Sequence, residues 1–393
     1  MKLNYLIISL TLFFFVFNSC KEKDELDDDV PELEVRDALE QDESPFRLSG
    51  LTDEIRYIPL ETTDSSLLSG VDKLQLTRKH IFVSDLTGLY QFDLSGSFIR
   101  QIGGPGKGPG EHGEIIRFSV SPGRGEVYIF SSNIMRIYDI ETGAYKREFY
   151  AGYDISDFIV LQDYLVLFTH ELPSEALDAS INEVYIIDTN GDVVDTIPNY
   201  DRLKHTNIQS PRGFANVYRK NKDELHYLFN YGDTLYSINS DIERRVYTVF
   251  NLDNEITRND LSIEPIYDEI QYPDFLWIPE ISGNAQNLFI TIEKGRILKI
   301  DPDIEGNIQR ILYDKTSGEL VPTPGFSNDI DGGLTFWPDF SAENTLVAYY
   351  QPYQIIEHYE TTAGTDGHSE GFVNLVKSLD ENDNPVLVLV ETL

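Results

Sequence analysis

A repeat of short strands is the feature that most constrains how this chain folds. Each repeat contains a strand, a turn, a second strand that ends in Asp or Asn, a further turn and a third strand. The residues that close the second strands are Asp93, Asp139, Asp188, Asn239 and Asp301, at steps of 46, 49, 51 and 62 residues. Periods of about 40 to 50 residues built from short strands are typical of β-propellers, in which each repeat is a four-stranded blade. The closing Asp suits a turn, and we expect it to be structural.

A sixth blade can be assembled from the two ends of the repeat region. Residues 345–350 predict one strand and residues 354–357 another, and residues 370–379 predict a short amphipathic helix. An apolar strand, 386–390, ends the chain, and an early strand, 55–60, has no blade of its own. Pairing these two strands closes the ring and removes exposed strand edges. The sequence therefore predicts an all-β, six-bladed propeller closed by its N- and C-terminal strands, with five or seven blades as alternatives.

The chain begins with a hydrophobic leader that ends at Cys20, its only cysteine. A stretch of about 13 mostly apolar residues, 5–17, is too short to span a bilayer of roughly 30 Å as a helix, but it suits a cleaved signal. The small residue before a lone cysteine resembles a bacterial lipoprotein signal, so we expect residues 1–20 to be a signal peptide and Cys20 to be lipidated. The alternative is a spare thiol near a disordered end, and Phe17 departs from the Leu, Val or Ile usual at its position.

An acidic segment follows the cysteine. Residues 21–43 contain twelve Asp and Glu against three Lys and Arg, too little apolar surface to offset chain entropy. We therefore expect a disordered tether over 21–46 and the propeller over 47–393. The start of this segment, Lys21-Glu22 with Asp24 and Glu25, resembles an export signal that sends lipoproteins to the outer face of the outer membrane in some diderm bacteria. Cell-surface display is the expected location, and an anchor facing the periplasm is the alternative.

The charge of the chain excludes some classes of partner. The formal net charge is −36, which argues against nucleic-acid binding, because Lys and Arg must neutralise phosphates there. It also argues against adsorption to anionic lipid without the anchor. A single cysteine allows no intramolecular disulfide.

Four stretches give the chain a family resemblance: 58–63, 100–111, 328–338 and 383–389. They resemble the six-bladed β-propeller lipoproteins of diderm bacteria, a family related to the NHL-repeat propellers. The resemblance covers about residues 51–393. It implies a surface or periplasmic binding protein of unknown ligand and no single activity.

A glycine-rich stretch, 103–110, invites comparison with a phosphate-binding loop. The register fails, because such a loop needs Gly, four residues, Gly-Lys and then Ser or Thr. A rigid loop between blades explains the stretch better, since proline fixes φ and glycine accepts positive φ. Glu111 and His112 follow the glycines and are candidate binding residues at the mouth of the central channel.

Three further residues are candidate binding residues. Asp329 and Asp331 lie in a stretch, 328–332, that resembles the head of a calcium loop but lacks its closing bidentate Glu; turn chemistry is the alternative explanation. Trp337 follows this loop and could stack on a sugar or a peptide, whereas a core position between blades is the alternative. Trp277 is expected in the core.

No catalytic motif emerges. The seven histidines lack zinc-like spacing, there is no Gly-x-Ser-x-Gly elbow, and carboxylates are too abundant for one pair to be singled out. We expect no metal or other cofactor, with calcium as the alternative. The expected function is binding of a glycan, a peptide or an envelope protein. A lyase or hydrolase that uses channel carboxylates, with or without calcium, and a structural subunit of an uptake complex are the alternatives.

Overall fold

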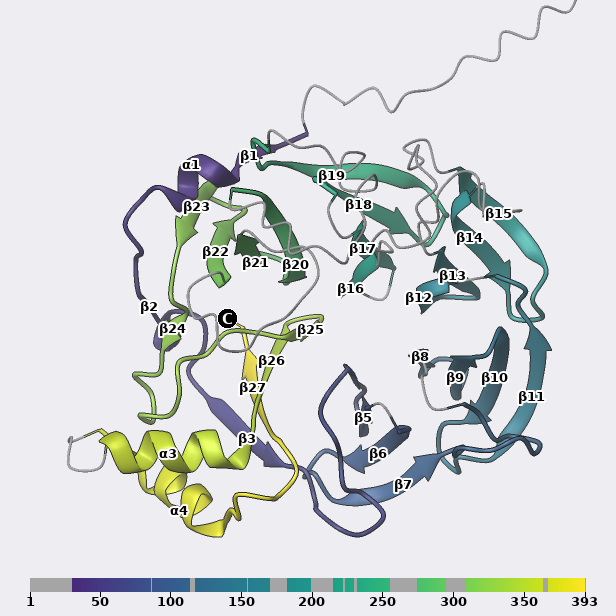
Figure 1. Ribbon diagram of the computed structural model, residues 1–393, viewed down its shortest axis with the longest axis horizontal. Helices are drawn as coiled ribbons and strands as arrows, with labels where there is room; N and C mark the ends of the chain where they lie inside the picture. The colour runs from purple at the N-terminus through teal and green to yellow at the C-terminus, as the bar shows by residue number, and fades with distance from the viewer. Residues whose placement is uncertain are drawn as a thin grey trace, which may run out of the picture.

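The computed structural model shows four-stranded antiparallel sheets arranged around a central axis (Figure 1). It describes residues 30–85, 87–113, 117–153, 155–169, 182–198, 215–221, 223–229, 232–254, 274–294, 308–362 and 367–392, with backbone alone in 215–221. Six such blades are formed within these ranges, and the two ends of the described chain meet in the sixth. The predicted six-bladed fold is confirmed.

The first three blades follow one another along the chain. Each is given from its innermost strand outward. Blade 1 consists of β4 (Lys73–Leu76), β5 (His80–Ser84), β6 (Leu89–Asp93) and β7 (Phe98–Ile102). Blade 2 consists of β8 (Arg117–Ser121), β9 (Glu126–Ser131), β10 (Ile134–Asp139) and β11 (Tyr145–Tyr150). Blade 3 consists of β12 (Ile155–Leu161), β13 (Tyr164–Thr169), β14 (Asn182–Asp188) and β15 (Val193–Pro198).

The other three blades include the strands from the two ends of the chain. Blade 4 consists of β16 (Ala215–Asn221), β17 (Glu224–Phe229), β18 (Thr234–Asn239) and β19 (Arg244–Asn251). Blade 5 consists of β20 (Leu276–Gly283), β21 (Asn287–Lys294), β22 (Ile308–Asp314) and β23 (Glu319–Pro322). Blade 6 consists of β25 (Phe340–Ala342), β26 (Thr345–Tyr350), β27 (Val386–Glu391) and β3 (Ile55–Pro59).

Ring closure depends on the pairing of β3 with β27. The two strands are antiparallel, with Pro59 opposite Val386 and Ile55 opposite Val390. Pro59 is at the end of an outermost strand, where its missing N–H costs no ladder hydrogen bond. The first five residues of β27 are buried, because this strand lies between two others and inside the molecule. The predicted closure by the two chain ends is confirmed.

The Asp or Asn that closes each third strand caps a hairpin. Asp93 Oδ1 accepts hydrogen bonds from the backbone N–H of Ser95 and Ser97, at 2.8 and 3.0 Å, and Asp139, Asp188 and Asn239 bind their own turns in the same way. In blade 5 this residue is Asp314, which accepts from the N–H of Thr316 at 2.7 Å. The prediction of Asp301 is wrong in this respect, because β21 pairs directly with β22; residue 301 itself lies outside the described residues.

Two helices separate β26 from β27 and cover the outside of blade 6 (Figure 1). They are α3 (Pro352–Thr362) and α4 (Glu370–Ser378). The predicted strand at 354–357 is wrong, because it is part of α3, where Pro352 occupies the first helical position that suits proline. The predicted helix at 370–379 is confirmed as α4. Ser369 caps it by accepting a hydrogen bond from the N–H of Phe372 at 3.1 Å.

The N-terminal part of the described chain packs against the propeller. It contains β1 (Glu32–Glu34), α1 (Val35–Leu39), β2 (Phe46–Arg47) and the 3₁₀ turn η1 (Leu48–Gly50). β1 pairs in parallel with β19, and β2 pairs with β24 (Phe326–Ser327). The prediction of a disordered tether over 21–46 is therefore wrong from residue 30 onward. Residues 21–29, like the leader and Cys20, lie outside the described residues.

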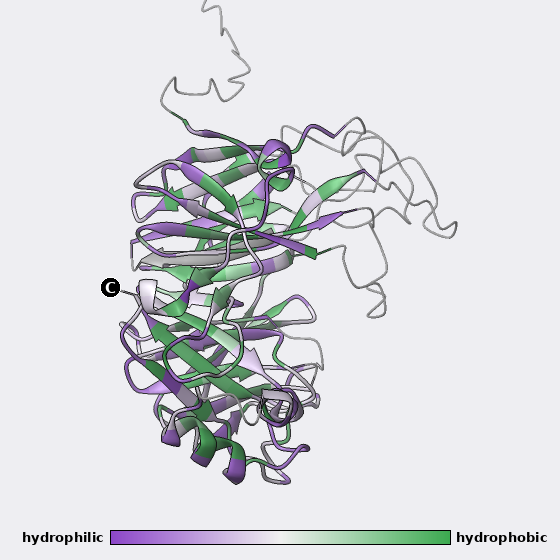
Figure 2. Ribbon diagram, turned by 90° about the vertical axis from the view of Figure 1, so that its left-hand side faces the viewer, coloured by the Kyte–Doolittle hydropathy of each residue, from purple (hydrophilic) through white to green (hydrophobic). Residues whose placement is uncertain are grey.

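Apolar side chains fill the space between blades. Each neighbouring pair of blades shares a cluster of buried hydrophobic residues, and a seventh cluster joins α3 and α4 to blade 6. Figure 2 shows the blades from the side, with hydrophobic stretches along the strands. Burial of each Leu, Ile or Phe side chain contributes about 1.5 to 3 kcal/mol, so these clusters hold the ring together without a disulfide. Within the described ranges, each helix is too short or too polar to cross a bilayer.

Candidate functional site

The two ends of the ring differ in their connections. The innermost strands all begin at one end, which we call the loop end. Segments 103–113, 323–339 and 351–385, described in whole or in part, connect strands there. At the opposite end, the hairpin end, the turns are short, such as 77–79 and 343–344. The Asp-capped turns lie at the hairpin end, so the repeat residues are remote from the longer loops.

Charged residues near the start of the innermost strands join blades across the axis. Lys73 on β4 places its Nζ 2.7 and 2.8 Å from the two carboxylate oxygens of Asp157 on β12. This ion pair joins blade 1 to blade 3, which are not neighbours. Between them, Arg117 on β8 donates from Nε to the carbonyl oxygen of Ser156 at 2.8 Å. On the other side of the ring, β16 and β25 contact each other although blade 5 separates them in the order. These contacts narrow the axis.

Two carboxyl groups lie at the junction of blades 5 and 6. Glu280 is on the innermost strand β20, and Asp339 directly precedes β25. The strand register places Glu280 opposite Thr291, and Thr291 opposite Arg310. Asp339 Oδ2 accepts a hydrogen bond from the N–H of Tyr349 at 3.0 Å. We call Glu280 and Asp339 the acid pair.

Burial makes this acid pair unusual. Desolvation raises the pKa of Asp339 to about 7, the charge of Glu280 adds to the rise, and Arg310 opposes it. Desolvation also raises the pKa of Glu280, again against the charge of Arg310. Yet the Glu280 side chain is exposed to solvent. A side chain in a narrow, water-accessible recess satisfies both observations, because protein surrounds it while water still reaches it.

Such a pair can exchange protons and hydrogen bonds with a ligand. A carboxyl group whose pKa is near 7 is present in both protonation states at neutral pH. It can therefore donate a hydrogen bond when protonated and accept one when ionised. Within the described part of the chain, no three His, Cys, Asp or Glu side chains are grouped to hold a metal ion.

Glu111 and His112 stabilise the glycine-rich loop. Glu111 accepts a hydrogen bond from the N–H of Gly108 at 2.7 Å. His112 is only 1% exposed, and its Nδ1 and Nε2 lie 2.8 and 3.3 Å from the carbonyl oxygens of Gly113 and Ile102. The imidazole ring is therefore enclosed by the loop that it supports and does not face a ligand.

Asp329 and Asp331 bind different partners. Asp329 accepts hydrogen bonds from the N–H and hydroxyl of Ser49 at 3.0 and 2.7 Å, which lower its pKa. Asp331 accepts from the Tyr57 hydroxyl at 3.2 Å and from Asn328 Nδ2 at 2.7 Å. The two carboxylates thus hold the N-terminal segment and β3 in place.

Trp337 is 6% exposed and lies in the core between blades 5 and 6. Its Nε1 donates to the hydroxyl of Thr291 at 3.2 Å, and its ring packs edge-on against Phe289. Since Thr291 is the residue between Glu280 and Arg310 on the sheet, Trp337 supports the acid pair from behind. The core alternative therefore describes this tryptophan, with a position next to the candidate site.

The sequence did not single out the acid pair. The chain has 67 Asp and Glu residues, so individual carboxylates carry little information. One signal was present: Glu280 interrupts a mostly apolar strand that begins at Leu276. An acidic residue within an innermost strand would be expected to face the axis rather than the space between blades.

Comparison with solved structures supports the fold. A candidate exported protein of Bacteroides fragilis NCTC 9343 is similar with a TM-score of 0.66 and 18% identity, covering 92% of this chain and 99% of that protein. A member of the DUF4221 family from Bacteroides vulgatus ATCC 8482 is similar with a TM-score of 0.48 and 12% identity, covering 87% of this chain and 96% of that protein.

Sequence comparison gives the family. No curated protein matches the chain. A family model described as a domain of unknown function, DUF4934, matches residues 30–391. The match begins with the N-terminal segment and ends with β27, so it spans the whole described propeller. The chain therefore belongs to the DUF4934 family.

Proposed function

We propose that this protein is a lipid-anchored, extracytoplasmic propeller that binds a ligand at the loop end of its axis. The observation on which the proposal depends is the acid pair, which is surrounded by protein and accessible to water. Desolvating two carboxyl groups is unfavourable in the absence of a partner. A ligand that donates hydrogen bonds to Glu280 and Asp339 would offset this cost.

The chemistry of the acid pair favours ligands rich in hydrogen-bond donors. Sugar hydroxyls and peptide amines or amides meet this requirement, so the ligand is a glycan, a peptide or a segment of an envelope protein. The net charge of −36 disfavours polyanions.

Attachment through Cys20 is the second part of the proposal. The signal-like leader and the acidic residues after it support lipidation and export, and the similar B. fragilis protein is described as a candidate exported protein. We propose display on the cell surface. Metabolic labelling with an alkyne fatty acid should mark the wild-type chain and not the Cys20→Ser variant, and protease added to intact cells should degrade it. A labelled variant, or full protection from protease, would contradict the two parts respectively.

Binding can be tested with variants at the two ends of the ring. The chain from residue 20 onward, with Cys20→Ser, is applied to glycan and peptide arrays, and each hit is titrated in solution. Glu280→Gln and Asp339→Asn should each weaken binding at least tenfold. The control, Glu141→Gln, changes an exposed carboxylate that binds Lys79 at the hairpin end and should leave affinity unchanged. Equal affinity for all variants, or no binding on either array, would refute the proposed ligand site.

An enzymatic role is the second candidate function. It is favoured by one observation: Asp339 has a pKa of about 7 beside a second carboxyl group, as general acid–base catalysis at neutral pH requires. Incubation of the protein with the array hits, followed by mass spectrometry, should detect cleavage products if the protein is a lyase or hydrolase. Asp339→Asn should then abolish turnover. Intact ligands after prolonged incubation would leave binding as the function.

A further inference from the structure

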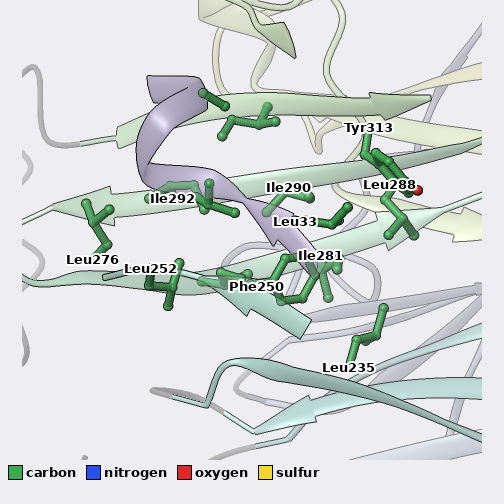
Figure 3. Packing of buried hydrophobic residues seen from close by; sticks show 14 of the residues in the cluster. Leu33, Leu235, Phe250, Leu252, Leu276, Ile281, Leu288, Ile290, Ile292 and Tyr313 are labelled. Atoms are coloured by element: carbon green, nitrogen blue, oxygen red, sulfur yellow. The ribbon is translucent and has the colours of Figure 1, made fainter. Parts of the chain in front are cut away.

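The segment before the closing strand contacts three successive blades. We call residues 30–54 the strap. Its first element, β1, extends blade 4, with Glu32 opposite Val249 and Glu34 opposite Asn251. Between these two glutamates, Leu33 is only 3% exposed. Figure 3 shows Leu33 among side chains of blades 4 and 5, including Phe250 and Ile290.

The next element of the strap bridges blades 4 and 5. Helix α1 contacts β19 of blade 4 and β22 and β23 of blade 5. Val35 and Ala38 are buried in the cluster that these blades share. Arg36 donates from Nε to the carbonyl oxygen of Leu252 at 2.9 Å and from Nη2 to that of Asp274 at 2.8 Å. These contacts fix the helix to residues that follow β19 and precede β20.

The last part of the strap bridges blades 5 and 6. The N–H of Ser44 donates to the carbonyl oxygen of Pro322 at the end of β23, at 2.9 Å. After β2 pairs with β24, Leu48 and Leu51 enter the cluster shared by blades 5 and 6. The hydrogen bonds between Ser49 and Asp329 hold this turn. Thus the strap completes two of the six clusters between blades.

The position of the strap matters because of how β3 is held. β3 is the outermost strand of blade 6, and within the sheet it pairs with β27 alone. If the N-terminal segment met the fold directly at Ile55, a pull on it would act first on that one pairing. The strap places three earlier sets of contacts between the tether and β3. A pull must break these before it reaches the strand that closes the ring.

We propose that the strap is a second closure of the ring, which bears tension from the N-terminal tether and thereby protects the pairing of β3 with β27. Its cellular use depends on the proposed anchorage at Cys20, whereas its mechanical property does not. The strap leaves the molecule at the outer edge of blade 4 (Figure 1). Tension is thus applied at the rim, away from the acid pair.

Single-molecule pulling tests the proposal directly. Cys20 is the only cysteine, so the unacylated chain from residue 20 can be held by this thiol and by a C-terminal tag. The first event in the wild-type chain should release the strap, with a length gain of up to about 85 Å for residues 30–54, before any blade opens. In the variant Leu33→Asp with Arg36→Ala, release should need less than half the force.

A matched control and two outcomes decide the result. Glu32→Gln with Asp37→Asn changes two exposed residues of the same segment and should unfold like the wild type. Equal forces for the wild-type and Leu33→Asp/Arg36→Ala chains would overturn the proposal. So would a first event in which strap and blades open together. Since the thiol serves only as a handle, failure of lipidation in cells would leave this result unaffected.

A second design keeps every strap contact. A protease site is inserted between Gln41 and Asp42, which are exposed and follow α1, and is cut after folding. The fragment from residue 20 to the cut should remain bound at rest, and under load it should leave while the ring stays closed. Hydrogen exchange of β3 should not change on cutting. A fragment that dissociates spontaneously, or a ring that opens when the strap is cut, would contradict the proposal.

Discussion

Asp339 is the residue whose environment departs most clearly from that of a surface carboxylate. It directly precedes the innermost strand of blade 6, accepts a hydrogen bond from Tyr349 and is near Glu280. Its pKa of about 7 in the folded state compares with 3.8 in the absence of these surroundings. The folded protein therefore holds a proton on Asp339 over a pH range in which the unfolded chain has released it.

This difference predicts how stability depends on pH. Because the folded state binds the extra proton, the free energy of unfolding should fall as pH rises from about 4 to about 7, and the loss should be complete above pH 7. Asp339→Asn has no proton to lose and can still accept from the Tyr349 N–H. It should be more stable than the wild type at pH 8, by about 2 kcal/mol after allowance for solvent access, and similar at pH 4.

Urea unfolding at a series of pH values measures this effect. Asp53→Asn, a change at an exposed carboxylate, serves as control and should retain the wild-type slope. A variant Asp339→Asn that is less stable than the wild type at pH 8 would mean that the ionised carboxylate is favourable, contrary to the desolvation described here.

The ion pair between Lys73 and Asp157 predicts a second residue effect. Its side chains are 19% and 14% exposed, so Lys73→Met leaves a poorly solvated carboxylate. We expect a loss of about 2 kcal/mol in the free energy of unfolding. Lys79→Met breaks a pair that is 69% and 54% exposed and should cost about 0.5 kcal/mol. Equal losses, measured by urea unfolding, would show that the bridge across the axis is not special.

The sequence predicts local turn chemistry better than it predicts the site. Asp93 and its equivalents act on residues two to four positions away, so their role is visible in a short window of sequence. The acid pair is assembled from β20 and the residue before β25, about 60 positions apart. Its properties come from burial and from Arg310 on a third strand. No window of a single sequence contains that information.

At the scale of elements, the strand pattern gave most of the ring, and the exceptions have physical reasons. The assignment in blade 5 missed β22 as the third strand because apolar residues at 297–300 mimic a strand. The apolar run at 354–357 is compatible with either period, and Pro352 with the buried Ile355 decides for a helix. In the strap, acidic composition concealed the spacing of Leu33, Val35 and Ala38, which is what packs.

Helix α4 gives a prediction at this scale. The Ser369 hydroxyl satisfies the N–H of Phe372 in the first turn, and removal of such a cap costs about 1 kcal/mol. Ser369→Ala should lower the free energy of unfolding by that amount and speed hydrogen exchange at the start of α4. Ser369→Asp keeps an acceptor and should restore both. If the Asp variant behaved like the Ala variant, the cap would not be the cause.

For the whole molecule, the ring relates the two ends of the chain to the proposed function. The strap and β3 reach blades 4, 5 and 6 from the N-terminal side, and β27 reaches blade 6 from the C-terminal side. Apolar clusters between all neighbouring blades make the ring continuous, so the innermost strands stay in place around the axis. The acid pair at the loop end therefore depends on closure, since Asp339 belongs to the connection that enters the closing blade.

Closure can be measured with engineered cysteines in a Cys20→Ser background. Tyr57 faces Val388, and Ile58 faces Leu387. Successive facing pairs in an antiparallel ladder alternate between narrow and wide spacing, so at least one of the cysteine pairs 57/388 and 58/387 should form a disulfide under mild oxidation. The diagonal pair 58/389 should not. Disulfide formation in a facing pair alone is the predicted result; formation in neither facing pair, or equally in the diagonal pair, would contradict a ring closed by the two ends of the chain.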